Sequence, residues 1–138
     1  MKKGLFNEVN IKTNIANSPT NIIIPENFGN EAKGKTIAIT EAMVQNVCQA
    51  APLYLKLKVD FSTHFDTFGN RTSTLAIIPQ IKHENGTTTY YRLDMVNPDK
   101  VFFGNTNSFN LYVTDPWDNV LDITGWSAFY VSIRINTI

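Results

Sequence analysis

Apolar and polar residues alternate in two runs within residues 108–138. The alternate apolar positions are Phe109, Leu111 and Val113 in the first run and Phe129, Val131, Ile133 and Ile135 in the second. A period of two is typical of strands with one buried face, so both runs are predicted strands with these residues in the core. The segment Asp-Pro-Trp-Asp-Asn at 115–119 lies between them. Its proline restricts φ, and its Asp and Asn side chains can bond to the local backbone, so a turn is expected there.

A third run, at residues 53–61, alternates without a fault. Its central apolar positions, also predicted core, are Leu55, Leu57 and Val59. Shorter apolar runs predict further strands at 21–24, 35–40, 73–83, 87–95 and 101–103. Asn85 and Gly86 separate two of these runs and favour a β-hairpin, because both residues tolerate positive φ. Pro79 predicts an edge strand or a bulge.

Residues 40–51, TEAMVQNVCQAA, form the one segment with a helical pattern. Thr40 can act as the N-cap and Glu41 lies in the first turn, where the helix dipole favours an acidic residue. Met43, Val44 and Val47 would share one face, and Pro52 would end the helix. We therefore expect one short helix here.

About eight strand-like runs with a single short helix indicate an all-β chain. Loops, rather than regular helices, separate these strands, which excludes a parallel doubly wound sheet and favours two packed antiparallel sheets. We expect an antiparallel two-sheet sandwich, a single jelly roll, over residues 19–138. Residues 1–18 show too weak a pattern to be assigned and are expected to form an N-terminal arm or extension.

Composition supports one neutral domain. The chain has 138 residues, of which 17% are charged, and its formal net charge is zero. Bulk nucleic-acid binding is not expected of a neutral chain. The single cysteine, Cys48, excludes an intrachain disulfide framework and is expected to be a buried, inert thiol. No apolar run approaches the roughly 18 residues of a membrane span, and the N-terminus lacks the apolar core of a signal peptide. The chain is expected to be soluble and not secreted by the usual route.

Motifs for catalysis or cofactor binding are absent from the sequence. It contains no glycine-rich phosphate loop, no Cys-x-x-Cys, no nucleophile elbow and no His-Glu-x-x-His. His64 and Asp66 would share a face of a strand, but a metal site would need further ligands. The scattered aspartates, including Asp115 and Asp118, have a simpler explanation as turn formers. We expect no enzyme activity, no cofactor and no metal.

Aromatic residues offer a different kind of site. Trp117, Trp126, Tyr90 and Tyr112 could present flat apolar faces with polar tips, as sugar-binding sandwiches do. The alternative is that the two tryptophans cap the open ends of the core. Trp117, in the predicted turn, is expected to be at least partly exposed.

The closing stretch FNLYVTDPWDNVLDITGWSAFYVSIRI, residues 109–135, carries a family resemblance. It resembles the C-terminal end of jelly-roll virion structural proteins, penton or minor capsid-like, of small double-stranded DNA viruses and virus-derived transposable elements. The shared features, in order, are a strand, an Asp-containing turn, a Val-Leu-Asp-Ile segment, a glycine and a final strand. Residues 91–103, which precede this stretch, are also similar in spacing. Trp117 departs from the small or polar residue that such turns often carry, and the chain is short for a major capsid subunit with two fused jelly rolls.

The resemblance implies a non-enzymatic capsid, vertex or decoration subunit that self-assembles or docks on a shell. Its implied partners are further copies of itself and other capsid proteins, and its implied location is the virion, otherwise the cytoplasm. The arm at residues 1–18 would then order on a neighbouring subunit. The alternative is a carbohydrate- or receptor-binding β-sandwich module such as a fibre or spike head, which would use a glycan or a host receptor as its partner.

Overall fold

The computed structural model describes residues 8–24, 34–46, 52–61, 63–65, 67–84, 88–96, 98, 100–104 and 108–137, and every regular element in this part of the chain is a strand. The elements are β1 (Glu8–Asn14), β2 (Thr20–Ile23), β3 (Lys35–Asn46), β4 (Tyr54–Val59), β5 (His64–Phe65), β6 (Arg71–Thr72), β7 (Thr74–Glu84), β8 (Thr88–Asp94), β9 (Val101–Gly104), β10 (Ser108–Thr114) and β11 (Ala128–Thr137). The expectation of an all-β antiparallel chain is confirmed.

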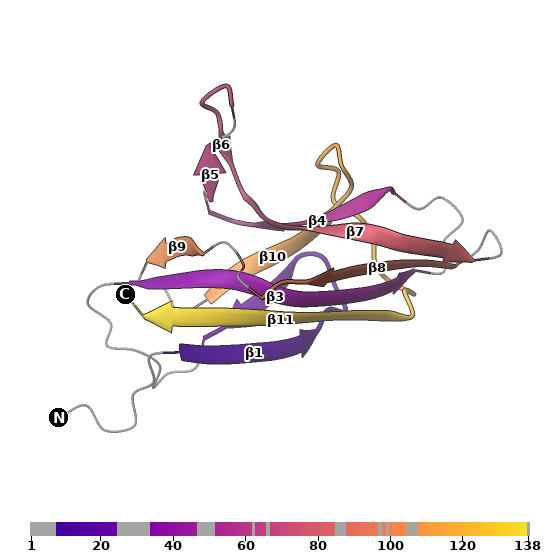
Figure 1. Cartoon of the computed structure of the whole chain (residues 1–138), viewed down its shortest axis with the longest axis horizontal. Coiled ribbons are helices and arrows are strands. Elements are labelled where there is room, and N and C mark those ends of the chain that lie inside the picture. The colour runs from indigo at the N-terminus through magenta and orange to yellow at the C-terminus, as the bar shows by residue number, and fades with distance from the viewer. Residues whose placement is uncertain are drawn as a thin grey trace.

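Eight of these strands form one curled antiparallel sheet in the order β1-β11-β3-β8-β7-β4-β10-β2. Outside this path, β9 pairs with the start of β3, and β5 pairs with β6. Figure 1 shows β1, β11, β3 and β8 running side by side, with the small β5–β6 pair projecting away from the body of the sheet. The arrangement is consistent with a β-sandwich or a jelly roll.

The sheet curls at β7, which has different partners along its length. Its first part, Thr74 to Pro79, pairs with β4, and its last part, Gln80 to Glu84, pairs with β8. The pairing path is therefore continuous, and two separate sheets are not distinguished. We refer to β1, β11, β3 and β8 as the β1 half and to β7, β4, β10 and β2 as the β2 half. The register of β7 with β8 shifts between Gln80 and Lys82, close to Pro79, where an edge strand or a bulge was predicted.

The core lies inside the curl and draws residues from both halves. The core positions predicted within the alternating runs are buried: Leu55, Leu57, Val59, Phe109, Leu111, Val113, Phe129, Val131, Ile133 and Ile135. The run at 53–61 is less regular at its ends, because Leu53 is exposed and Phe61 is only partly buried. They join one cluster with apolar residues of β3, β7 and β8, among them Ile37, Val44, Ile78 and Tyr91. The two closing strands do not pair with each other. β10 lies between β4 and β2, and β11 lies between β1 and β3.

The expected helix at residues 40–51 is wrong over its described part, because Thr40 to Asn46 belong to β3. β3 contains a β-bulge at Thr40: Ile39 pairs with Ile133 and Glu41 pairs with Ser132, so Thr40 is an extra residue. Inward positions are odd before the bulge and even after it. After the bulge the outward Met43 is apolar and exposed, whereas the inward Asn46 is polar and buried, so the strand shows no alternation of apolar and polar residues there. Residues 47–51, including Cys48, lie outside the described residues.

Residues 8–14, part of the expected N-terminal arm, form β1. Each of them pairs with β11 of the same chain, from Glu8 opposite Asn136 to Asn14 opposite Tyr130. The hairpin predicted at Asn85 and Gly86 has its flanking pair, Glu84 opposite Thr88, in place. The turn itself lies outside the described residues.

Candidate binding surfaces

The turn between β10 and β11 is built around one carboxylate. Asp115 accepts hydrogen bonds from the backbone N–H groups of Trp117 and Asn119 and from the Asn119 side-chain amide, each at 2.9 Å. The Asp115 N–H in turn donates to the Asn119 carbonyl at 3.0 Å. The Asn119 side-chain amide, followed by the backbone donors, lowers the pKa of Asp115. Trp117 therefore lies in a turn whose backbone is fixed by hydrogen bonds to the Asp115 carboxylate.

Asp118 fastens this turn to the outer face of β4. Its φ of 70° is in the left-handed region, which Asp tolerates better than most residues. Its Oδ1 accepts from the Lys58 Nζ at 2.9 Å and from the Lys56 Nζ at 3.1 Å. These hydrogen bonds, Lys58 first, lower the pKa of Asp118 against the opposing effect of desolvation. The side chain of Asp118 is 52% exposed, so each ion pair contributes little stability and mainly fixes the position of the turn.

Trp117 is 78% exposed on this fixed turn. With Pro116 of the same turn and Pro52, Leu53 and Tyr54 at the start of β4, it lines an open depression of about 380 Å³. We call these five residues the Trp117 platform. An exposed indole beside a tyrosine and two prolines offers apolar faces with polar tips, which suits stacking against a flat apolar face of a ligand.

The other aromatic candidates lie apart from the platform. Tyr112 projects from β10 opposite Lys58, on the same outer face. Trp126 stacks on Phe129 with ring centroids 6.0 Å apart and packs against the core, as the capping alternative expects. Tyr90 lies on β8, in the β1 half. The Nζ of Lys82, on the neighbouring strand β7, lies 4.8 Å from the centroid of the Tyr90 ring. A hydrogen bond with Glu84 raises the pKa of Tyr90. The structure thus gathers no aromatic strip from these four residues.

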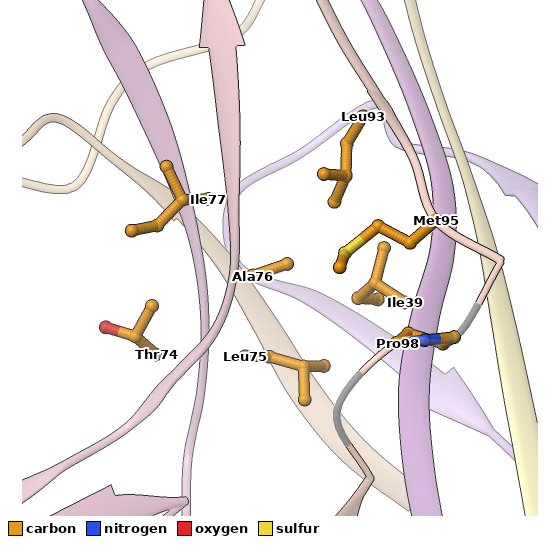
Figure 2. Close-up of a pocket in the computed structure, with 8 residues that line it drawn as sticks. All are labelled: Ile39, Thr74, Leu75, Ala76, Ile77, Leu93, Met95 and Pro98. Carbon is orange, nitrogen blue, oxygen red and sulfur yellow. The ribbon is translucent and has the colours of Figure 1, made fainter.

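A second depression lies where the first part of β7 and the end of β8 separate, and alternation along single strands did not indicate it. Figure 2 shows its lining of eight residues: Ile39, Thr74, Leu75, Ala76, Ile77, Leu93, Met95 and Pro98. Its volume is about 320 Å³, and Thr74 carries its one side-chain polar group. This lining contains no pair of side chains that could act as acid, base or nucleophile.

Two further carboxylates have partners within a few residues of their own strand or loop. The Thr124 side chain, followed by the Thr124 N–H that donates to Asp122 at 3.0 Å, lowers the pKa of Asp122. Asp94 lies 3.5 Å from Arg92. Within the described ranges no three His, Cys, Asp or Glu side chains gather as metal ligands would. The side chain of His64 and all of Asp66 lie outside those ranges. No helix long and apolar enough to cross a bilayer occurs in the part of the chain that the structure describes.

The sequence matches no protein-family model and no curated protein.

Proposed function

We propose that the chain is a non-enzymatic structural protein of a virion, a single-jelly-roll subunit of capsid, vertex or decoration type. The observation that carries this proposal is the strand order. Strands β1, β3, β8 and β11 belong to one half of the curl, and β2, β4, β7 and β10 belong to the other. From β1 to β4 the chain changes half at every step, and it does so again from β8 to β11 once β9 is set aside. This order supports a double Greek key, the jelly-roll topology found in viral capsid and lectin domains.

The surface of the described chain supports a role in assembly. Large apolar side chains are exposed on both halves and on the connecting segments, among them Ile23, Met43, Phe68, Ile81, Val96 and Phe102. A subunit of a closed shell meets several neighbours, and many modest contacts become strong in number. Asp115, Asp118 and Asp122 are engaged in turns and ion pairs, which agrees with a structural role.

The test is the assembly state of the purified full chain. Light scattering and electron microscopy over a range of protein concentrations are expected to reveal closed particles or symmetric oligomers larger than a dimer, alone or with other shell proteins of the same virion. A chain that assembles no further than a dimer under all of these conditions would refute the structural role.

The Trp117 platform favours a second candidate, a glycan- or receptor-binding module. The supporting observation is an indole that is 78% exposed on a turn held by Asp115 and Asp118. A rigid, exposed aromatic side chain reduces the entropy lost on binding. This candidate predicts that neutral oligosaccharides quench tryptophan fluorescence in the native chain.

Trp117→Ala is expected to abolish this quenching while changing the free energy of unfolding by no more than about 0.5 kcal/mol, since the side chain is mostly in solvent. Phe68→Ala is the matched control, because Phe68 is also an exposed aromatic residue but lies away from the platform. Quenching that persists in Trp117→Ala would exclude the platform as the binding site.

A further inference from the structure

β1 forms one border of the curled sheet (Figure 1), and among the described residues its only partner strand is β11. It is seven residues long and free of proline. The opposite border differs, because β2 has four residues and Pro19 and Pro25 flank it in the sequence. Short strands and prolines protect sheet edges from pairing, whereas a long regular edge invites it. The β1 edge is therefore the one suited to accept another strand.

The hydrogen-bonding direction of β1 follows from the end of its ladder. The Ile15 N–H donates to the Phe129 carbonyl at 2.8 Å, one step beyond the pair of Asn14 and Tyr130. In an antiparallel ladder, alternate residues direct both backbone groups to the same neighbour. Odd residues of β1 thus bond to β11, and the N–H and C=O groups of Glu8, Asn10, Lys12 and Asn14 point to the open edge.

This edge is complementary to itself. If two antiparallel copies of β1 meet with Asn10 opposite Asn10, then Glu8 faces Lys12 of the other copy twice and Val9 faces Ile11 twice. The register also matches edge-directed residues with edge-directed residues, as antiparallel pairing requires. The even residues of β1 are exposed, and Val9 and Ile11 are partly buried against the core. Charged pairs would therefore meet on the outer face and apolar pairs on the inner face.

The two charged side chains of β1, Glu8 and Lys12, are too far apart to pair with each other within one chain. Glu8 and Lys12 lie on the same face of one strand, roughly 13 Å apart at a strand rise of about 3.3 Å per residue, which is beyond contact. The Asn136 side-chain amide donates to the Glu8 Oε1 at 3.1 Å and holds this carboxylate on the outer face. Opposite charges directly across a strand pair stabilise the pairing.

We propose that β1 is a dimerisation edge, which pairs antiparallel with β1 of a second copy about a two-fold axis at Asn10. The pairing joins the β1 halves of two chains into one continuous sheet by β-augmentation. The proposal goes beyond the shell function and does not rest on it, because it concerns a pairwise contact that can form in solution. A contact of one short strand is small, so the free dimer is expected to be weak, in the micromolar range or weaker, and to weaken further with salt.

Sedimentation velocity of the full chain at increasing concentration tests the proposal. The native chain is expected to show a monomer–dimer equilibrium. Glu8→Lys and Lys12→Glu each turn two attractive pairs into two repulsive ones and should weaken dimerisation by about tenfold or more. Lys100→Glu is the matched control for Lys12→Glu, because it makes the same charge change at an exposed site outside β1 and should leave dimerisation unchanged.

Mixing the two single variants provides the decisive measurement. A Glu8→Lys chain carries lysines at positions 8 and 12, and a Lys12→Glu chain carries glutamates at both. The heterodimer therefore has four complementary charges in the same register, and the 1:1 mixture is expected to regain native-like dimerisation that neither variant shows alone. The double variant Glu8→Lys/Lys12→Glu should also dimerise as the native chain does.

Amide hydrogen exchange locates the contact. The N–H groups of Asn10 and Lys12 should become protected as the protein concentration rises, whereas that of Ile11 should be protected throughout because it bonds to β11. A chain that is monomeric at millimolar concentration, a dimer insensitive to both charge reversals, or a mixture that fails to regain dimerisation would each overturn the proposal. Dimers that never build larger particles would leave it intact and count against the shell function alone.

Discussion

The alternation along β10 can be tested by placing the same carboxyl group on its two faces. Leu111 has no exposed surface, whereas its neighbour Asn110 is partly exposed on the outer face. Leu111→Asp puts the carboxyl into the core between Val59 of β4 and Thr20 of β2, its register partners. Asn110→Asp is nearly isosteric and keeps the oxygen that accepts from the Asn21 amide at 3.1 Å. The two variants therefore differ in which face carries the charge.

The expected loss of stability in Leu111→Asp has two parts. Removing a buried leucine side chain costs about 2–5 kcal/mol. A carboxyl in this position has to be protonated, which at pH 7 costs about 4 kcal/mol, since the ordinary Asp pKa is about 3.9 and each pH unit corresponds to about 1.36 kcal/mol. The sum, about 6–9 kcal/mol, is comparable with the whole stability of a domain, about 5–15 kcal/mol. Asn110→Asp should change the free energy of unfolding by no more than about 0.5 kcal/mol.

Urea unfolding followed by tryptophan fluorescence measures both variants. Leu111→Asp is expected to be largely unfolded at pH 7. Burial raises the folded-state pKa of the introduced carboxyl, so its penalty grows with pH above the unfolded-state value and shrinks on acidification. The deficit relative to the native chain should fall by about 2.7 kcal/mol between pH 7 and pH 5. If Leu111→Asp is as stable as Asn110→Asp and shows no such pH dependence, the inward face of β10 has been assigned wrongly.

Two further perturbations concern the segment between β10 and β11. Asp118→Asn keeps a residue that tolerates positive φ but removes the charge that Lys56 and Lys58 bind, so urea midpoints at pH 7 should give a loss of up to about 1 kcal/mol. Because the folded-state pKa of Asp118 is lowered, this loss of stability is present above about pH 4 and should vanish as the pH falls through the lowered pKa. A difference in stability between the variant and the native chain that persists in acid would contradict the ion-pair explanation. Gly125→Ala should lower the free energy of unfolding by about 1 kcal/mol in thermal unfolding, because Gly125 has a φ of 87°, which alanine adopts only with strain. No atom lies where the new methyl group would stand, so the loss would come from the backbone conformation and not from a clash. An unchanged melting temperature would show that this φ is not required.

Sequence periodicity predicted the regular strands and failed where a bulge changes the phase. In β4, β10 and β11 the alternation of single residues matches the buried positions. In β3 the extra residue at Thr40 moves the inward positions from Ile37 and Ile39 to Ala42 and Val44, and Met43, which a helix would place beside Val44, is exposed. The bulge at Thr40 involves neither proline nor glycine and is defined by the register with β11, so the sequence of β3 alone does not reveal it.

The surfaces were less predictable than the core because they are formed by residues distant in the sequence. The turn at 115–119 was predicted from Asp and Pro, yet its attachment to Lys56 and Lys58 follows from the pairing of β10 with β4. The depression in Figure 2 joins residues of β3, β7 and β8 and has no signature in any one of them. Local chemistry thus predicts a turn, whereas a surface needs the strand order.

The same reasoning explains why β1 was unassigned from its sequence and is informative in the sheet. Alone, the segment EVNIKTN is a weak alternation of apolar and polar residues. Its position at the border and its register with β11 determine which backbone groups point outward. Once these outward groups are known, the equal spacing of Glu8 and Lys12 on either side of Asn10 indicates that the two charges would pair between two copies of β1. A sheet that continues across this edge would also bring the outer faces of two β1 halves into one surface, so an assembled shell would present them as a unit.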